Sequence, residues 1–201
     1  MLVTNFMLFT NPAAAWARIH ASARSATRYL LAHTALLALI PAVCGYYGTT
    51  HTGWQIGDSP LMRLAERSAL LIAVMYYVAM VLGTTTLGWM IHWMSRTYGA
   101  RQPFSQCVAL ATYAATPIFL AGAITLQPIL WVNLLVGLGA LAYAVFLLYA
   151  GTPILMEIPR ERGFLYSSAI VAFGLAALVA FLALTVLLWS WGLQPTFVRA
   201  S

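Results

Sequence analysis

The chain has 201 residues, of which 62% are hydrophobic and only 7% are charged. A soluble globular domain is about half apolar and about a quarter charged. Ten basic and four acidic side chains cannot supply a water-facing surface for a chain of this length. The composition therefore excludes a soluble globular protein and predicts one that is embedded in lipid.

Residues 1–28 are the first expected unit, a cytoplasmic N-terminal segment. They lack the basic start that precedes the apolar core of a cleaved signal peptide. Asn11 followed by Pro12 predicts the start of a helix, because asparagine caps the first amides and proline has no amide hydrogen to leave unpaired.

If that helix continues, its apolar and basic side chains separate onto two sides. Trp16, Ile19, Ala23, Ala26 and Leu30 share one face, and away from it lie Arg18, Arg24 and Arg28. This pattern is typical of an interfacial helix that lies in the membrane surface with its arginines near anionic lipid headgroups. The alternative is a tail that only adds positive charge to the cytoplasmic side.

Five apolar runs are each long enough to cross a bilayer, which takes about 20 helical residues. Their hydrophobicity is continuous, so helices are expected instead of a transmembrane barrel. We predict an all-α integral membrane fold, a bundle of five transmembrane helices preceded by a short amphipathic helix. The transmembrane domain is residues 29–191, the tail is residues 192–201, and the spans are residues 29–47, 68–93, 107–126, 129–150 and 166–191.

The third and fourth spans are separated only by Gln127 and Pro128, and this turn makes them an antiparallel hairpin. In the third span, Pro117 cannot donate an amide hydrogen, so it is expected to kink the helix and free the carbonyl of Tyr113. Tyr143 lies at a similar depth on the fourth span, and its hydroxyl could satisfy that carbonyl. This kink has two interpretations. It could open a cleft for a lipid or another ligand, or it could be purely structural.

The stretch LYAGTPILMEIPRERG, residues 148–163, carries half of the carboxylates of the chain. Gly151 and Pro153 are expected to end the fourth helix, because glycine fits a helix cap and proline disfavours helix in the residue before it. The charged residues then lie in an inner loop. They mark the cytoplasmic side, or they form a docking patch for a soluble protein, and the two interpretations are compatible.

The arginines predict the orientation in the membrane, because positive residues favour the cytoplasmic side. A cytoplasmic N-terminus leaves only Arg63, Arg67 and Arg199 outside. The seven arginines inside are Arg18, Arg24, Arg28, Arg96, Arg101, Arg160 and Arg162. With five crossings, the C-terminus is then outside.

The sequence offers no catalytic, cofactor-binding or metal site. It contains no nucleophile elbow and no glycine-rich phosphate loop, and no histidine has a second metal ligand three or four residues away. His33 is the one candidate for a proton-coupled role inside a span, with a structural histidine as the alternative. The arginines form no dense cluster, so nucleic acid is not an expected partner. We therefore expect a protein that is not an enzyme.

Several short motifs follow one another along the chain: NPAAAW, IPAVCGYYGTTHTGWQIGD, YAATP with FLAG downstream, LYAGTP, and RERGFLYSS. In this order they resemble the YIP-domain membrane proteins, in particular the YohC-like branch of bacterial inner-membrane proteins. The positions that match the family pattern are Tyr113, Pro117, Tyr149, Gly151, Pro153 and Gly163. The resemblance covers almost the whole chain and implies five spans in a bacterial inner membrane.

The resemblance implies membrane organisation or an adaptor role, and no known reaction. Eukaryotic YIP proteins are linked to Rab GTPases. The N-terminal segment here is short and lacks their acidic, aromatic motif, so a Rab-type GTPase is not an expected partner.

Two functional classes follow. The first is a non-catalytic inner-membrane protein that binds anionic headgroups and partner proteins at its inner face, with a homo- or hetero-oligomer as a further expectation. Its docking residues would be Arg96, Arg101, Glu157, Arg160, Glu161 and Arg162. The second is a transporter or lipid-translocating protein that uses a cleft near the Pro117 kink, with Gln127 and Asn133 at its outer mouth.

Overall fold

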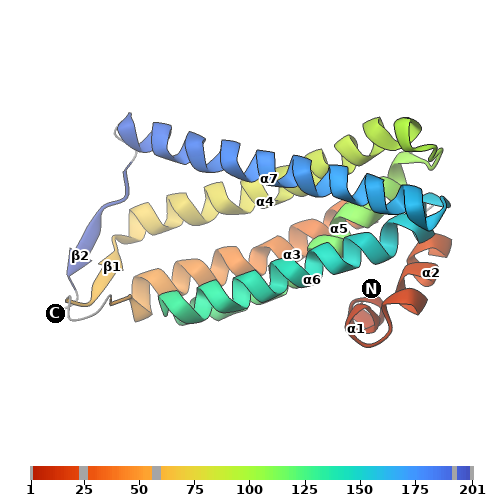
Figure 1. Cartoon of the computed structure of the whole chain (residues 1–201). Coiled ribbons are helices and arrows are strands. Elements are labelled where there is room, and N and C mark those ends of the chain that lie inside the picture. Colours follow the sequence, from red (N-terminus) through yellow and green to blue (C-terminus); the bar gives the residue numbers. More distant parts are fainter. Residues whose placement is uncertain (1, 23–26, 56–59, 192–193, 200–201) are drawn as a thin grey trace.

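The computed structural model describes residues 2–22, 27–55, 60–191 and 194–199. Within these ranges, two short helices precede five long ones (Figure 1). The helices are α1 (Leu2–Thr10), α2 (Pro12–Ser22), α3 (Thr27–Tyr47), α4 (Glu66–Ser95), α5 (Phe104–Ala121), α6 (Leu130–Met156) and α7 (Arg160–Ser190). Short helical turns extend three of them, namely η2 (Gly48–Thr52), η3 (Arg96–Tyr98) and η4 (Gly122–Leu126). The two strands are β1 (Met62–Leu64) and β2 (Phe197–Arg199).

The predicted five-helix bundle is confirmed. Over the described ranges, five helical segments are long and apolar enough to cross a membrane, and each overlaps one predicted span. Figure 1 shows α3 to α7 running along one common direction, with the N-terminus beside one end and the C-terminus beside the other. A chain that runs along the bundle an odd number of times has its two termini at opposite ends.

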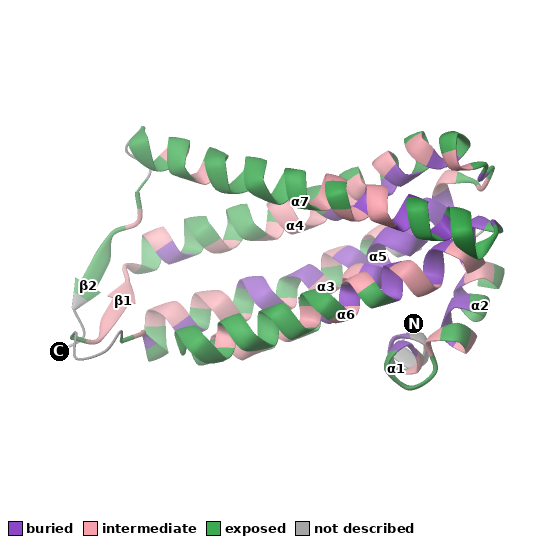
Figure 2. Ribbon diagram, viewed as in Figure 1, coloured by how far each residue is buried: buried purple, intermediate pink, exposed green. Residues whose placement is uncertain are grey.

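The central helix of the bundle is α5. It packs against α3, α4 and α6, and residues 105–114 are all buried. Its small side chains, such as Ala109 and Ala111, let neighbouring helices approach closely, which is how helices associate where no hydrophobic effect drives them together. In contrast to the buried α5, the second half of α7 is mostly exposed, as Figure 2 shows. Most of its exposed side chains are apolar, which suits contact with lipid.

The prediction that Gly151 and Pro153 end the fourth helix is wrong. α6 continues to Met156 with both residues inside it, and it stops where Glu157 adopts a left-handed conformation with φ of 52°. Proline removes one backbone hydrogen bond, but membrane helices tolerate this loss because neighbouring helices satisfy the freed groups. Gly151 is therefore available for packing instead of capping.

The N-terminal helix α2 begins at Pro12 as predicted, and the amide of Ala14 donates to Oδ1 of Asn11 at 3.2 Å. The sequence did not predict α1. In α2, Trp16 and Ile19 are buried, and the helix packs against α6. The apolar side that the sequence assigned to lipid thus contacts protein at these two positions, because α6 leaves room for the indole ring.

The rest of the expected interfacial face lies outside the described residues. Arg24 falls in residues 23–26, and the side chain of Arg28 at the start of α3 is also outside what the structure describes. Arg18 is exposed on α2. The interfacial placement of this segment therefore stays a prediction.

The tail that follows α7 pairs with the loop that precedes α4. β1 and β2 are antiparallel, with Met62 opposite Arg199, and the hydroxyls of Ser68 and Thr196 are 2.8 Å apart. This small sheet was not predicted, because three-residue strands show too little alternation to be recognised in a sequence. It joins the two segments at the end opposite to α2.

Candidate functional site

Most of the described charged side chains from the predicted inner segments gather at one end of the bundle. This arginine-rich end consists of α2, η3, residues 99–103 and residues 157–162. Figure 1 shows these segments together at the end that lies farthest from the C-terminus. The site therefore combines parts of the chain that are far apart in sequence.

Three arginines at this end line one hollow. Arg96 belongs to η3, Arg101 follows it in the loop, and Arg162 lies in the first turn of α7. Together with His92, Ser95, Gly99 and Gln102 they surround a volume of about 800 Å³. The sequence placed all three arginines on the inner side, but it could not place them around a shared space.

The shape of this hollow depends on Gly99, which has a φ of 80°. Glycine adopts this left-handed conformation without strain, and the turn sends the chain from η3 back toward α5. A Cβ atom at Gly99 would lie 2.9 Å from Nη1 of Arg162. The missing side chain thus leaves the space that the Arg162 guanidinium uses.

Aromatic contacts hold α7 against α4 next to the hollow. The rings of Tyr98 and Tyr166 stack with centroids 4.8 Å apart and planes at 13°, and the Tyr166 hydroxyl donates to the carbonyl of Ile91. Arg162 lies four residues before Tyr166, on the same helix face. The contacts of Tyr166 therefore also position the backbone of Arg162 beside the hollow.

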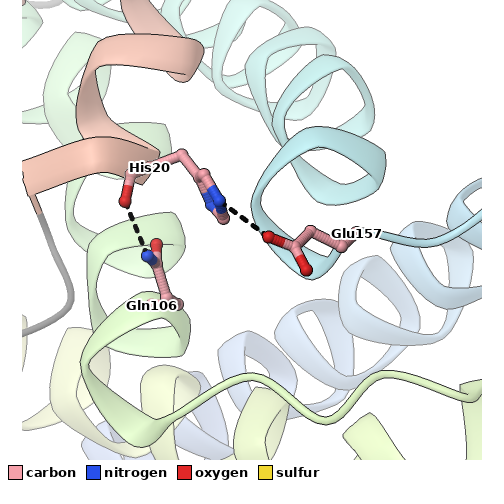
Figure 3. A network of polar contacts seen from close by, with 3 residues as sticks. All are labelled: His20, Gln106 and Glu157. Atoms are coloured by element: carbon pink, nitrogen blue, oxygen red, sulfur yellow. Dashed lines mark hydrogen bonds and ion pairs between the residues drawn. The ribbon is translucent and has the colours of Figure 1, made fainter.

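A polar network attaches α2 to the bundle beside the hollow (Figure 3). Nε2 of His20 lies 2.9 Å from Oε1 of Glu157, which follows α6. Nε2 of Gln106, a fully buried residue of α5, donates to the backbone carbonyl of His20 at 2.8 Å. Three elements are thereby joined at one point.

Trp16 completes this attachment with apolar contact. Its indole ring is fully buried, and a Cβ atom at Gly151 would lie 2.5 Å from its Cε2 atom. The close approach of α2 to α6 therefore requires glycine at position 151. At the other N-terminal helix, the Tyr143 hydroxyl donates to the carbonyl of Leu8 at 2.9 Å, so it binds α1 and not the Tyr113 carbonyl that the sequence suggested.

The predicted docking residues divide into three groups. Arg96, Arg101 and Arg162 line the hollow. Glu157 bonds to His20. The remaining two, which are exposed in the first turn of α7, are Arg160 and Glu161.

Sequence reasoning did not assign a role to His20, His92 or Gln106. A signal existed for His92, which precedes Arg96 by four residues and so shares its helix face. Its ring also makes an edge contact with Phe104, with centroids 5.7 Å apart. For His20 and Gln106 no signal existed, because their contact spans 86 residues of sequence.

The family-pattern residues on α6 and α7 lie at helix contacts. The Tyr149 hydroxyl is 2.8 Å from the Ser168 hydroxyl, and a Cβ atom at Gly163 would lie 3.1 Å from Cβ of Pro153. Gly151 receives Trp16, as described above. These positions therefore set how closely α2 and α7 approach α6.

The other two family-pattern residues lie in the centre of the bundle. Tyr113 and Pro117 are both buried on α5, and the ring of Tyr113 has its centroid 5.4 Å from that of His33. His33 is itself buried in α3. Its ring is packed inside the bundle, where its Nε2 atom has no hydrogen-bond partner among the described residues, and its role stays a prediction.

A groove exists near Pro117. It has a volume of about 310 Å³ and is lined by apolar residues of α4, α5, α6 and α7, including Ala114 and Ile118 on either side of the proline in sequence. The Asn133 side chain does not reach it, since its amide donates to the carbonyls of Gln127 and Ile129 beside the start of α6. Over the described residues, no three histidine, cysteine or acidic side chains are grouped in a way that could hold a metal ion.

Comparison with known proteins agrees with this architecture. Residues 6–181 match the Yip1 domain. The inner membrane protein YohC of Escherichia coli K12 is 38% identical over 185 residues, which are 92% of this chain and 95% of that protein. The protein of the same name from Escherichia coli O6:H1 gives the same values. No solved structure shows a significant match.

These similarities extend over nearly the full length of the chain and include all five spans except the end of the last. The names of the relatives and the apolar helices together support a location in the inner membrane. The chain is a multi-pass membrane protein that belongs to the Yip1-domain family and is similar to YohC.

Proposed function

We propose that this protein is a non-catalytic adaptor of the inner membrane, which binds a partner protein at its arginine-rich end. The observation that supports this role best is the attachment of α2 to the bundle through His20, Gln106 and Glu157. The attachment holds α2, with its exposed Arg18, close to the loop that leads into α7, whose first residue Arg160 is also exposed. A surface of fixed charges selects a partner of complementary charge.

The first turn of α7 provides charges of both signs for such a contact. Arg160 and Glu161 are exposed and lie outside the hollow. Rim charges of this kind contribute more to the rate and specificity of association than to affinity. We therefore place the protein contact on this turn.

The proposal also places the arginine-rich end in the cytoplasm. Of the described arginines, five lie at this end. Three lie at the other end, namely Arg63, Arg67 and Arg199. An excess of arginine marks the cytoplasmic side of a membrane protein. A soluble or membrane-bound partner would then approach from the cytoplasm.

Photocrosslinking in native membranes tests the proposal. A photoreactive amino acid replaces Arg160 or Glu161 in turn, and a matched control replaces Arg67 at the other end of the bundle. We expect one protein, identified by mass spectrometry, to crosslink from positions 160 and 161 and not from 67, and Arg160→Glu to abolish its crosslink from position 161. Crosslinks to lipid alone from both test positions would contradict the adaptor role.

The partner could be a second copy of this chain. Coexpression of two differently tagged copies decides between self-association and a different partner, since only self-association joins both tags in one crosslinked product. Either product supports a docking function for this end.

The groove near Pro117 is the basis of a second candidate function, lipid translocation. Its apolar lining suits a hydrocarbon chain. The same lining offers a passing headgroup no hydrogen-bond partner, and an unsatisfied polar group in an apolar environment is costly. The groove therefore favours holding an acyl chain over moving a whole lipid across the bilayer.

Reconstituted vesicles test this second candidate. With a fluorescent phospholipid in both leaflets, we expect the purified protein to leave the rate of lipid exchange between leaflets unchanged. A protein-dependent rate that falls in Ala115→Trp, which fills the groove, would favour translocation over the adaptor role. Ala115 lines the groove, so the variant separates passage through the groove from disturbance of the bilayer.

A further inference from the structure

The hollow at the arginine-rich end concentrates positive charge. Three arginines, Arg96, Arg101 and Arg162, line the same space of about 800 Å³. The residues that line it include no carboxylate, and in the described part of the chain no salt bridge joins these arginines to an acidic side chain. Like charges around one space repel one another unless an anion lies between them.

The residue types of the lining fit a phosphate group. Guanidinium groups bind phosphate through paired hydrogen bonds, and Arg suits this better than Lys because its donors form a planar fork. Arg162 is also the third residue of α7, where the unpaired amides of a long helix add partial positive charge. Ser95 and Gln102 supply polar side chains to the same space.

The position of the hollow indicates where the phosphate comes from. Trp89 and Trp93, 57% and 65% exposed, lie on α4 within two turns of Arg96, and exposed tryptophan favours the headgroup level of a bilayer. On α7, the residues that follow Arg162 within one turn include the exposed Phe164 and Leu165. The hollow is therefore bordered by side chains suited to acyl chains and headgroups.

We propose that this hollow binds the phosphate of an anionic phospholipid headgroup, held between Arg96, Arg101 and Arg162. His92 borders the same space and can donate a further hydrogen bond from its ring. The bound lipid would link η3, the loop before α5 and α7, which are the segments that carry the three arginines. This proposal does not require a protein partner and can fail independently of the adaptor role.

Native mass spectrometry of the full chain in detergent tests the site. The probes are phosphatidylglycerol, which is anionic, and phosphatidylcholine, whose headgroup carries no net charge. We expect phosphatidylglycerol to be retained preferentially by the unmodified protein, and Arg96→Gln and Arg162→Gln each to lower its retention at least about tenfold, because each removes a charge-assisted paired contact. Arg67→Gln, at the end of α4 that lies opposite to η3, is the matched control and should retain the lipid.

Two further variants separate the guanidinium geometry from simple charge. Arg162→Lys keeps the charge and loses the planar fork, so we expect retention between those of the unmodified protein and Arg162→Gln. Arg160→Gln removes a neighbouring charge outside the hollow, and we expect a smaller effect than for Arg162→Gln. If the helical variants fail to fold, Arg101→Gln carries the test, because Arg101 is exposed in a loop.

Three results would overturn the proposal. Equal retention by the unmodified protein, Arg96→Gln and Arg162→Gln would mean that no lipid site exists here. An equal loss in Arg160→Gln would assign the effect to general surface charge. Displacement of the lipid by an equimolar amount of inorganic phosphate would assign the hollow to a soluble anion and not to a membrane lipid.

Discussion

Gly151 determines where the N-terminal helices lie. The Trp16 ring occupies the space that a side chain at this position would fill, with Cε2 only 2.5 Å from the ideal Cβ position. Most of the buried surface of α2 centres on this ring and on Ile19. The missing side chain on α6 thus lets α2 pack this closely against the bundle.

The first prediction concerns this contact. Gly151→Leu should displace Trp16 and destabilise the docked α2 by about 1–3 kcal/mol, because overpacking forces the neighbours to move. Thermal unfolding and tryptic cleavage after Arg18 measure the effect. Gly137→Leu on the same helix is the control, since a Cβ atom at Gly137 meets nothing within 4 Å. Equal stability of the two variants would contradict the packing role of Gly151.

The second prediction ranks the members of the polar network. Gln106→Leu should raise tryptic cleavage after Arg18 more than His20→Ala does. The first substitution removes the donor of a part-buried hydrogen bond to the His20 carbonyl, and an acceptor left unpaired inside a protein costs about 1–3 kcal/mol. The second removes a partly exposed contact with Glu157, and such contacts contribute about 0–1 kcal/mol. The reverse order would show that the Glu157 contact dominates.

At the scale of elements, the sequence predicted the existence and type of the five spans, because hydrophobic length alone decides them. It misplaced the end of α6, because glycine and proline are typical of a helix end. In the structure both residues lie inside α6, and Gly151 contacts Trp16 of α2. It also missed β1 and β2, whose pairing joins positions 62 and 199. Contacts between distant segments have no local signature.

The third prediction concerns the contact between α4 and α5. A Cβ atom at Gly88 would lie 3.1 Å from Cα of Val108, so Gly88→Val should separate the helices and lower stability by about 1–3 kcal/mol. Gly83→Val is the control on α4, because a Cβ atom at Gly83 meets nothing within 4 Å. Thermal unfolding in one detergent compares the two variants. If Gly83→Val were as destabilising, the cost would come from valine itself and not from the contact.

At the scale of the whole molecule, the charges mark the two ends of the bundle. The sequence predicted that Arg96, Arg101 and Arg162 share one side of the membrane, because an even number of spans separates their segments, and the structure has all three at one end of the bundle. The number of spans between these segments could not show that the three arginines line one hollow. That arrangement depends on the turn at Gly99 and on the contact between Tyr98 and Tyr166, which only the folded chain brings together.

The proposed adaptor role depends most on which side of the membrane the arginine-rich end faces. Cysteine labelling in spheroplasts measures this directly, using a background in which Cys44 and Cys107 are replaced by alanine. We predict that a membrane-impermeant maleimide labels Arg67→Cys in intact spheroplasts, and labels Arg160→Cys only after lysis. Labelling of Arg160→Cys in intact spheroplasts, with Arg67→Cys protected until lysis, would contradict a cytoplasmic position of the arginine-rich end.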